Sequence, residues 1–369
     1  MLSATSGQSN WSPNWATHPG DHLAEMIEER GWSQAEFSRI ADLSPKLVST
    51  IISGKNRVSP ETAIKLERVL GLKAYIWTGL QSNWDLFQAR SEAVRPDNWR
   101  DWLSNFPIKE LKKRGQLPST NDEGVIFNEL LTLLGIGSPD AYDAKIGSLA
   151  VQHRQSSAHS LSKHHIYTWL LLGERRARCK ALPKFDRSAF QYAVSEIRKL
   201  TTRDPEEFEP LLKDLCQQAG VAVVFEKPIS QTGLFGSARW FDADRAIIQM
   251  SLRMKTNDHF WWTFFHEAAH IILHQGRNFF DDYSAKAERA DAEIEADKWA
   301  TEILVGSDNL RRLLIERPRT RFAVCQAAED LRIHPGIIVG MLQHHKVLKH
   351  SYLNDLKVKF ELTESSDDC

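Results

Sequence analysis

The strongest constraint on the fold is the run from His266 to His270, which reads His-Glu-Ala-Ala-His inside a long apolar stretch. Residues four positions apart lie one turn from each other on the same face of a helix. The flanking residues 264–265 and 271–273 are apolar, so we expect this helix to be buried. A buried helix does not carry two histidines and a glutamate without polar partners. Another segment of the chain must therefore cover this helix and supply those partners.

This pattern also predicts a chemistry. Two imidazoles at this spacing can bind one zinc ion from the same side. Glu267, next to the first histidine, can take a proton from a zinc-bound water. The pattern therefore indicates zinc-assisted hydrolysis of an amide, with His266 and His270 as ligands and Glu267 as the catalytic base. The alternative is a pair of hydrogen-bonded core histidines beside a surface glutamate.

A zinc site of this kind needs a third protein ligand. Downstream, residues 291–304 are acidic at their start and carry apolar residues at helical spacing. Glu293 and Asp297 share one face of that helix, so Glu293 could bind zinc while Asp297 could hydrogen-bond a ligand histidine. Glu295 lies about 160° away around the helix and is the alternative ligand. An acidic helix start that faces solvent would also explain these residues.

A second motif lies near the other end of the chain, where residues 18–80 predict short helices with clear caps. Ser33 and Glu36 have the spacing of a capping box. Ser44-Pro45 and the later Ser-Pro pair at 59–60 each predict a helix start, with serine as the cap and proline at the first position. Two short helices joined by a tight turn, the second beginning with Ser-Pro, are typical of a helix-turn-helix.

We expect the second helix of this motif to enter the major groove of operator DNA, with the protein bound as a homodimer. The side chains that can face DNA are those of Ser44, Lys46, Ser49, Thr50 and Ser53, with Lys55 and Arg57 placed for phosphate contacts. Charge separation supports this, because residues 44–73 hold six basic and two acidic side chains, whereas residues 18–43 hold two and six. The alternative is a helical module that binds protein.

Composition limits the other possibilities. A chain of 369 residues predicts two or three domains. The net charge of −1 predicts no bulk attraction to nucleic acid or membranes, so any such surface must be local. No apolar run approaches the roughly 20 residues that span a bilayer, and the polar N-terminus lacks the order of a signal peptide. We therefore expect a cytoplasmic protein with no membrane partner.

With both motifs identified, the chain resembles two known families. Residues 18 to about 90 resemble the HigA-type antitoxin branch of the Xre helix-turn-helix family. The shared marks are His18-Pro19-Gly20, Trp32-Ser33-Gln34-Ala35-Glu36-Phe37, Ile52-Ser53-Gly54-Lys55, Ser59-Pro60-Glu61-Thr62-Ala63, Trp77-Thr78-Gly79-Leu80-Gln81 and Trp84-Asp85. This resemblance implies a DNA-binding regulator that has a toxin as its partner.

Residues from about 186 onward resemble the ImmA/IrrE family of zinc metallopeptidases. The marks are the His-Glu-x-x-His run with the trailing His274, the acidic run 293–297 and the segment 333–344. The resemblance implies His266, His270 and Glu293 as ligands of Zn²⁺ and Glu267 as base, favours Glu293 over Glu295, and places His274 beside the ligands. The chain departs from the family at Ala269, where glycine is frequent, and at Met341, where arginine is frequent.

Together these observations predict a mainly α fold with a small β-sheet (α+β). We expect a flexible N-terminus at 1–17, a helix-turn-helix domain at 18–85, a helical connector at 86–185, a zincin-like metallopeptidase domain at 186–350 and a tail at 351–369, of which 364–369 is disordered. The expected strands are 221–225, 238–241 and 246–250, with the last two forming a hairpin around 242–244. Residues 246–250 end shortly before the zinc helix. An edge strand beside that helix could pair with a substrate held in an extended conformation.

The resulting hypothesis is a transcriptional regulator fused to a zinc endopeptidase that cleaves a regulatory protein, such as a repressor or a toxin partner. His334, His344 and His345 are candidates for stabilising the oxyanion. The alternative is a non-catalytic antitoxin, which binds operator DNA and neutralises a toxin while its zinc domain is structural or a sensor. A third hypothesis is a protease whose N-terminal helices only recruit substrate.

Overall fold

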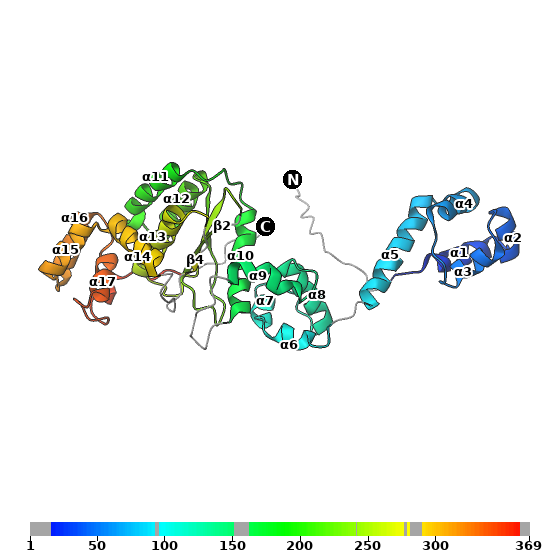
Figure 1. Ribbon diagram of the computed structural model, residues 1–369, viewed down its shortest axis with the longest axis horizontal. Helices are drawn as coiled ribbons and strands as arrows, with labels where there is room; N and C mark the ends of the chain where they lie inside the picture. The colour runs from blue at the N-terminus through cyan, green and yellow to red at the C-terminus, as the bar shows by residue number, and fades with distance from the viewer. Residues whose placement is uncertain are drawn as a thin grey trace, which may run out of the picture. The chain divides into compact units, whose positions relative to one another are not determined.

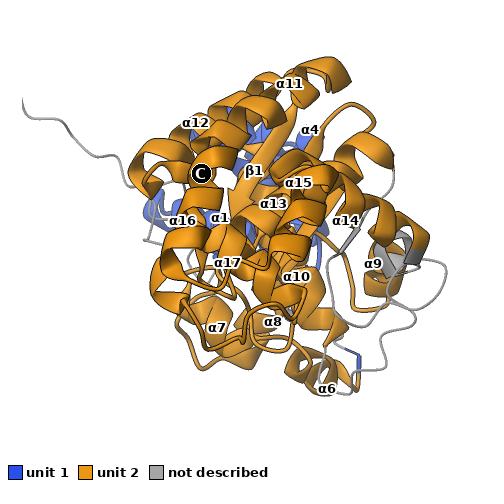
Figure 2. Cartoon of the chain, turned by 90° about the vertical axis from the view of Figure 1, so that its left-hand side faces the viewer, with its two compact units in different colours: residues 1–96 blue, residues 97–369 orange. Residues whose placement is uncertain are grey.

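The computed structural model describes residues 16–92, 96–150, 162–240, 242–276, 279–280 and 290–361. The chain divides into two compact units, Met1–Pro96 and Asp97–Cys369, which Figure 2 shows in blue and orange. Both units are mostly helical and one small sheet lies in the second, so the predicted α+β class is confirmed. No described helix is long and apolar enough to span a membrane.

Unit 1 folds around the capped helices that the sequence predicts. Its helices are α1 (Pro19–Glu29), α2 (Gln34–Ile40), α3 (Pro45–Ile52), α4 (Pro60–Leu70) and α5 (Ala74–Glu92). The Ser33 hydroxyl accepts from the Glu36 N–H and the Glu36 carboxylate accepts from the Ser33 N–H, which is the predicted capping box. The Ser44 and Ser59 hydroxyls cap α3 and α4 by accepting from the Leu47 and Thr62 N–H groups, without the reciprocal bond of a capping box. These caps satisfy N–H groups that the helices themselves leave without partners.

The N-terminus of α1 packs directly on the C-terminal end of α3. His18 caps α1 by accepting a hydrogen bond from the Gly20 N–H at its Nδ1, and its ring meets Trp84 of α5 edge-on at 5.1 Å. A Cβ at position 20 would lie 2.1 Å from the Ile51 carbonyl oxygen. Glycine is therefore required here for the two backbones to approach, which explains the His-Pro-Gly sequence at this point.

Unit 2 contains the remaining elements (Figure 1). Its α-helices are α6 (Trp99–Ser104), α7 (Ile108–Lys113), α8 (Glu123–Leu134), α9 (Ala141–Ala150), α10 (Lys163–Arg178), α11 (Arg187–Arg198), α12 (Pro205–Gln218), α13 (Asn257–Leu273), α14 (Ala290–Leu304), α15 (Ser307–Glu316), α16 (Arg321–Leu331) and α17 (Pro335–His344). The 3₁₀ turns are η1 (Lys199–Thr202) and η2 (Asn354–Leu356), and the strands are β1 (Val221–Phe225), β2 (Gly236–Trp240), β3 (Ala246–Met250) and β4 (Phe279–Phe280).

The four strands form one sheet in the order β1-β3-β2-β4. β2 and β3 form the predicted hairpin, with Gly236 opposite Met250, and β1 pairs with β3 in parallel. Residues 246–250 cannot be the substrate-binding edge strand considered from the sequence, because β1 and β2 pair with the two sides of β3. The edges of the described sheet are β1 and β4 instead.

Helices cover both faces of this sheet (Figure 1). Alternate residues of β1 point to opposite faces, as the pleat requires. Val221 and Val223 pack in the large core formed with α11, α12 and α13, whereas Ala222 and Val224 pack against Ala177 of α10. The helix α13, which carries the His-Glu-Ala-Ala-His run, lies inside the large core with most of its residues buried, as its apolar flanks predict.

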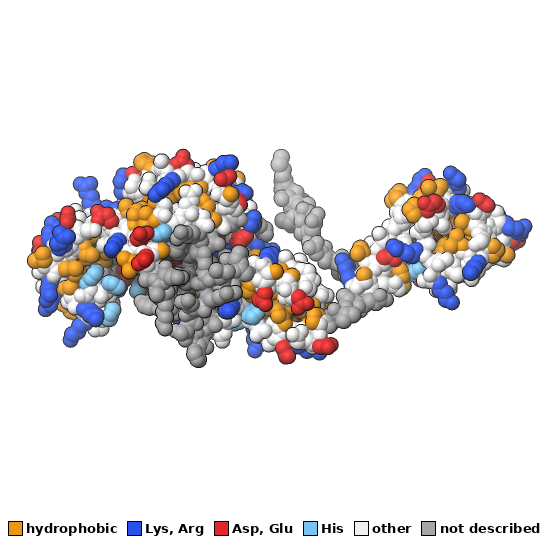
Figure 3. Space-filling model, viewed as in Figure 1, with side chains coloured by type: hydrophobic (Ala, Val, Ile, Leu, Met, Phe, Trp, Pro, Cys, Tyr) orange, Lys and Arg blue, Asp and Glu red, His pale blue; other side chains and the backbone are white. Residues whose placement is uncertain are grey.

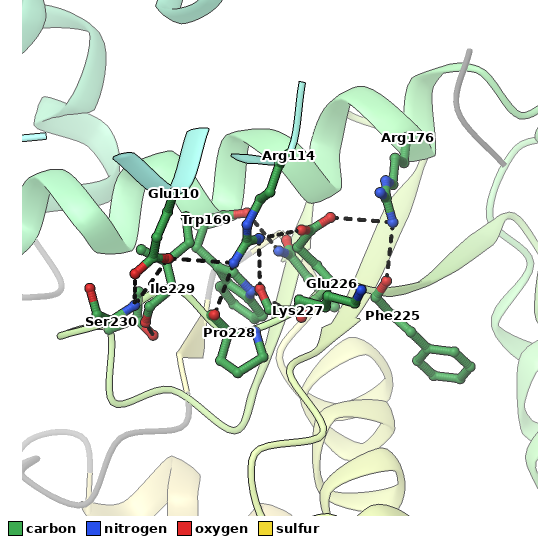
Figure 4. Close-up of polar contacts among 12 residues, drawn as sticks. Glu110, Arg114, Trp169, Arg176, Phe225, Glu226, Lys227, Pro228, Ile229 and Ser230 are labelled. Carbon is green, nitrogen blue, oxygen red and sulfur yellow. Dashed lines mark hydrogen bonds and ion pairs between the residues drawn. The ribbon is translucent and has the colours of Figure 1, made fainter. Parts of the chain in front are cut away.

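An ion pair with a buried carboxylate joins the end of α7 to the sheet (Figure 4). The guanidinium of Arg114, just after α7, donates to the Glu226 carboxylate at 2.8 Å and to the carbonyl oxygens of Lys227 and Pro228 at 2.9 Å. Arg176 of α10 approaches the second Glu226 oxygen at 3.4 Å. These contacts fix the start of the loop that leads from β1 to β2. The predicted connector 86–185 thus lies mostly in the same compact unit as the predicted peptidase domain.

The described part of the predicted tail packs on the core. Leu356 and Phe360 are buried in the large core, where the Phe360 ring contacts Phe208 and Phe260. A β-bridge joins Lys359 to Thr256, immediately before α13. Residues 351–361 therefore help to fix the start of the helix that carries the histidines. The predicted disordered segment 364–369 lies outside the described residues, as does most of the predicted flexible N-terminus.

Candidate metal centre and nucleic-acid interface

Three predicted ligands come together between α13 and α14. The Nε2 atoms of His266 and His270 are 3.0 Å apart, as their one-turn spacing on α13 predicts. The Oε2 atom of Glu293, from the first turn of α14, lies 3.0 Å from the His266 Nε2 and 3.4 Å from the His270 Nε2. Among the described residues these three form the one group whose nitrogen and carboxylate atoms all lie within 4.8 Å of one another.

The outer nitrogens of both histidines have partners of their own. Asp297 accepts a hydrogen bond from Nδ1 of His266 at 2.9 Å. Nδ1 of His270 lies 3.1 Å from Nδ1 of His274, whose Nε2 donates to Glu295 at 3.0 Å. With a proton on each Nδ1, both histidines present the lone pair of Nε2 to the space beside Glu293. Asp297 and His274 thus lie where the sequence analysis places them, and the alternative ligand Glu295 binds His274 instead.

Burial sets the charge states that metal binding needs. Burial lowers the pKa of His270 to about 4, and the Glu293 carboxylate only partly opposes this effect. The ring is therefore neutral at physiological pH, which is the form that binds a metal. Burial raises the pKa of Glu293, but its contacts with His266 and His270 outweigh burial and lower the pKa of this carboxyl.

These donors fit a zinc ion. Two imidazole nitrogens and one carboxylate oxygen are a common ligand set for catalytic zinc, which keeps its fourth position for water or substrate. Ligand atoms about 2.0–2.1 Å from a tetrahedral ion lie roughly 3.3 Å from one another. The three separations of 3.0, 3.0 and 3.4 Å are close to that value. If His266 and His270 were only hydrogen-bonded core residues, Glu293 would not need to lie close to both of their Nε2 atoms.

The proposed base, Glu267, is fully buried against the start of β2. A Cβ at Gly236 would lie 2.5 Å from its Oε1 atom and 2.8 Å from the Thr263 methyl group. The glycine at position 236 therefore leaves room for the Glu267 carboxylate, which a larger residue would displace. Sequence reasoning missed Gly236, and its one local signal was a glycine in a turn-rich segment before a predicted strand.

We expect Gly236→Ala to displace the Glu267 carboxylate without removing any metal ligand. The variant should bind zinc as the wild type does, but any Glu267-dependent hydrolysis should fall about tenfold or more, because misplacement by about 1 Å is costly in a catalytic site. Zinc content and cleavage rate measured on the same preparation check this. Gly79→Ala is the control, since a Cβ there meets no atom within 4 Å. An unchanged cleavage rate in Gly236→Ala would contradict the assignment.

The three oxyanion candidates lie outside the group of ligand atoms. His334 caps α17 by accepting from the Gly336 N–H, and its Nδ1 is 2.7 Å from the Asn257 amide nitrogen. His344 and His345 lie at the C-terminal end of α17, are exposed, and have ring centroids 5.1 Å apart. His334 thus has a structural role as a cap, while an oxyanion role for any of the three stays a prediction.

In unit 1 the predicted DNA-facing residues follow the outer side of α3. Val48 and Ile51 are fully buried against the core, whereas the side chains at 44, 46, 49, 53, 55 and 57 are exposed. Thr50 is half-buried, and its hydroxyl accepts a hydrogen bond from Asn56, a polar neighbour that sequence reasoning missed. Arg57 is exposed but pairs with Asp85 of α5, so Lys46 and Lys55 are the basic side chains of this surface that form no such pair with a described residue.

Comparison with known proteins identifies this part of the chain. A helix-turn-helix family model matches residues 23–77. The HTH-type transcriptional regulator YddM of Escherichia coli strain K12, described as uncharacterised, is 38% identical over 71 residues, which make up 19% of this chain and 76% of that protein. The chain belongs to the helix-turn-helix family.

Two further proteins match the chain at lower identity. Virulence-associated protein I of Dichelobacter nodosus is 28% identical over 78 residues, or 21% of this chain and 72% of that protein. A solved structure described as an antidote protein of a plasmid maintenance system from Nostoc punctiforme has 27% identity and a TM-score of 0.21, and the match covers 21% of this chain and 86% of that one. The family match includes α2 and α3 and confirms the predicted helix-turn-helix.

Proposed function

We propose that this protein is a DNA-binding transcriptional regulator whose second unit is a zinc-dependent endopeptidase. The observation that carries the proposal is the convergence of His266, His270 and Glu293, with the buried carboxyl of Glu267 next to His266 in the same helix. When both Nε2 atoms are unprotonated, three electron-rich atoms about 3 Å apart repel one another unless a cation lies between them. The helix-turn-helix of unit 1 supports binding to double-stranded operator DNA by the same chain.

The catalytic work divides among the residues of the second unit. A zinc ion held by His266, His270 and Glu293 would polarise the scissile carbonyl. It would also lower the pKa of a water molecule, which could then lose a proton and attack the carbonyl near neutral pH. Asp297 and His274 hold the two imidazole rings in the tautomer that leaves Nε2 available. Glu267 accepts the proton of the attacking water and delivers it to the nitrogen of the leaving amine. The substrate we propose is a regulatory protein, such as a repressor or a toxin.

The regulatory half of the proposal is tested by binding to the protein's own promoter DNA. We expect the double variant Lys46→Ala/Lys55→Ala to bind this DNA at least tenfold more weakly than the wild type in a gel-shift assay, because both side chains are exposed along α3 and the loop after it. Arg90→Ala, which removes an exposed charge near the end of α5, is the control and should bind normally. Equal binding by the double variant would exclude this surface as the DNA-binding face.

The enzymatic half is tested with the proteins encoded beside this chain. Wild-type protein loaded with zinc should cleave a neighbouring repressor or toxin, and Glu267→Gln should not. If the wild type cleaves neither protein while Glu267→Gln regulates as well as the wild type in cells, the peptidase proposal fails. That result would support the non-catalytic antitoxin, in which zinc has a structural or sensing role.

A further inference from the structure

The connection between α15 and α16 carries an unusual concentration of arginine. Residues 311–321 contain five arginines, no lysine and a single acidic residue, Glu316, although the chain as a whole has a net charge of −1. We call the exposed side chains of Arg312, Arg317 and Arg319 the arginine surface. Lys and Arg side chains project from this end of unit 2, where α15 and α16 lie (Figure 3).

The five arginines of residues 311–321 fall into two groups, those that form an ion pair and those that do not. Arg311 pairs with Asp308 in the same helix, and Arg321 pairs with Asp355. The three side chains of the arginine surface form no ion pair with any described residue. Three unpaired like charges within eight positions repel one another, so an arrangement of this kind favours an anionic partner.

The local backbone reinforces the positive potential at this place. Thr320 caps the N-terminus of α16, whose first turn has no acidic residue, so the positive end of the helix dipole lies beside the arginines. Arg317 ends α15 in a left-handed conformation, and the buried Pro318 follows it. The positions of Arg317 and Arg319 are thus fixed by two helix ends and a buried proline rather than by a long loop. Backbone N–H groups at a helix start and arginine forks are both suited to phosphate.

We infer that the arginine surface binds the phosphates of duplex DNA, as a second contact of this regulator that lies outside the helix-turn-helix. This inference rests on the proposed binding of unit 1 to operator DNA. Arginine, which binds phosphate with two parallel hydrogen bonds, is used here to the exclusion of lysine. The contact reads no base edges, so it adds affinity and salt dependence without sequence preference.

A protein partner is the competing explanation for this end of unit 2. Ile315 and Phe322 are 75% and 79% exposed and lie among the arginines, and exposed apolar and aromatic side chains often mark protein interfaces. Duplex DNA is favoured because three unpaired arginines and a helix start suit a polyanion, and because another unit of the chain has a DNA-binding fold. The two explanations predict opposite roles for the arginines and the apolar pair.

The test measures the binding of the full chain to labelled duplex DNA over a range of salt concentrations. The probes are the protein's own promoter region and an unrelated duplex of the same length. For Arg312→Gln/Arg317→Gln/Arg319→Gln we expect at least tenfold weaker binding to both probes at low salt. The slope of log affinity against log salt should become shallower by about 2.7, or roughly 0.9 for each phosphate that the variant no longer neutralises. The preference for the promoter should remain.

Two matched variants make the result decisive. Arg100→Gln/Arg187→Gln/Arg203→Gln removes the same charge from dispersed exposed sites of unit 2 and should leave the slope unchanged. Ile315→Ser/Phe322→Ser alters the apolar pair and should change DNA affinity less than about twofold. A wild-type slope in the arginine variant, or an equal loss of affinity in either matched variant, would overturn the inference. Absence of any promoter preference in the wild type would instead contradict the proposed function of unit 1.

Discussion

Glu267→Gln is expected to reduce peptide hydrolysis by about 10²–10⁴-fold, the usual contribution of a general base. The amide keeps the size of the carboxylate but cannot accept a proton from water at neutral pH. Because Glu267 is fully buried, its replacement by a neutral side chain should not destabilise the fold. The measurement is the rate of cleavage of a protein substrate by equal concentrations of zinc-loaded wild type and variant.

Zinc content separates this effect from loss of the site. Glu267 is not one of the three converging ligands, so the variant should retain as much zinc as the wild type. His274→Ala provides a graded comparison, because removal of the hydrogen bond to His270 should weaken zinc binding about 10–100-fold while the base remains. Cleavage by Glu267→Gln at the wild-type rate would show that another group acts as the base.

Arg114→Ala is expected to destabilise unit 2 by about 1.5–3 kcal/mol, the usual contribution of hydrogen bonds to a charged group, because Arg176 still pairs with Glu226 in the variant. The Glu226 side chain is 4% exposed, so it would lose its shorter ion pair in a place that water hardly reaches. The variant also leaves the carbonyl oxygens of Lys227 and Pro228 without their guanidinium donor. The measurement is the shift of the unfolding transition of unit 2 in urea.

The control for this variant is Arg100→Ala. Arg100 pairs with Glu123 in a largely exposed ion pair of similar length, so its removal should cost less than about 1 kcal/mol. If the two variants lose equal stability, Arg114 does not act as the clamp that joins the early helices of unit 2 to the sheet. A large loss for Arg114→Ala alone would support that role.

Local sequence was sufficient to predict the starts of α2, α3 and α4 in unit 1, because the interactions that start these helices span three or four residues. The Ser33–Glu36 capping box and the Ser44 cap form between neighbours and appear in the structure as predicted. The spacing of His266 and His270 is equally local, since one helical turn sets it. Elements of this kind depend little on the rest of the fold, which is why the sequence predicts them correctly.

Features that depend on distant partners were not predictable in this way. Helical spacing leaves Glu293 and Glu295 as alternative ligands. It shows that they lie on different faces of α14, but it does not show which face contacts α13. The sequence does not show that 221–225 pairs in parallel with 246–250, because β1 lies outside the hairpin and comes before it in the chain. Arg114 and Glu226 are 112 positions apart, and no local pattern relates them. Tertiary packing decides all three cases.

The proposed enzyme depends above all on the binding of zinc by His266, His270 and Glu293. Metal analysis of the purified wild type and of His266→Ala/His270→Ala, both dialysed against zinc and then against metal-free buffer, tests this most directly. We expect about one zinc per chain in the wild type and almost none in the variant, since a single ligand is insufficient for a stable site. A wild type without zinc, or a variant that retains as much as the wild type, would contradict zinc binding at this site.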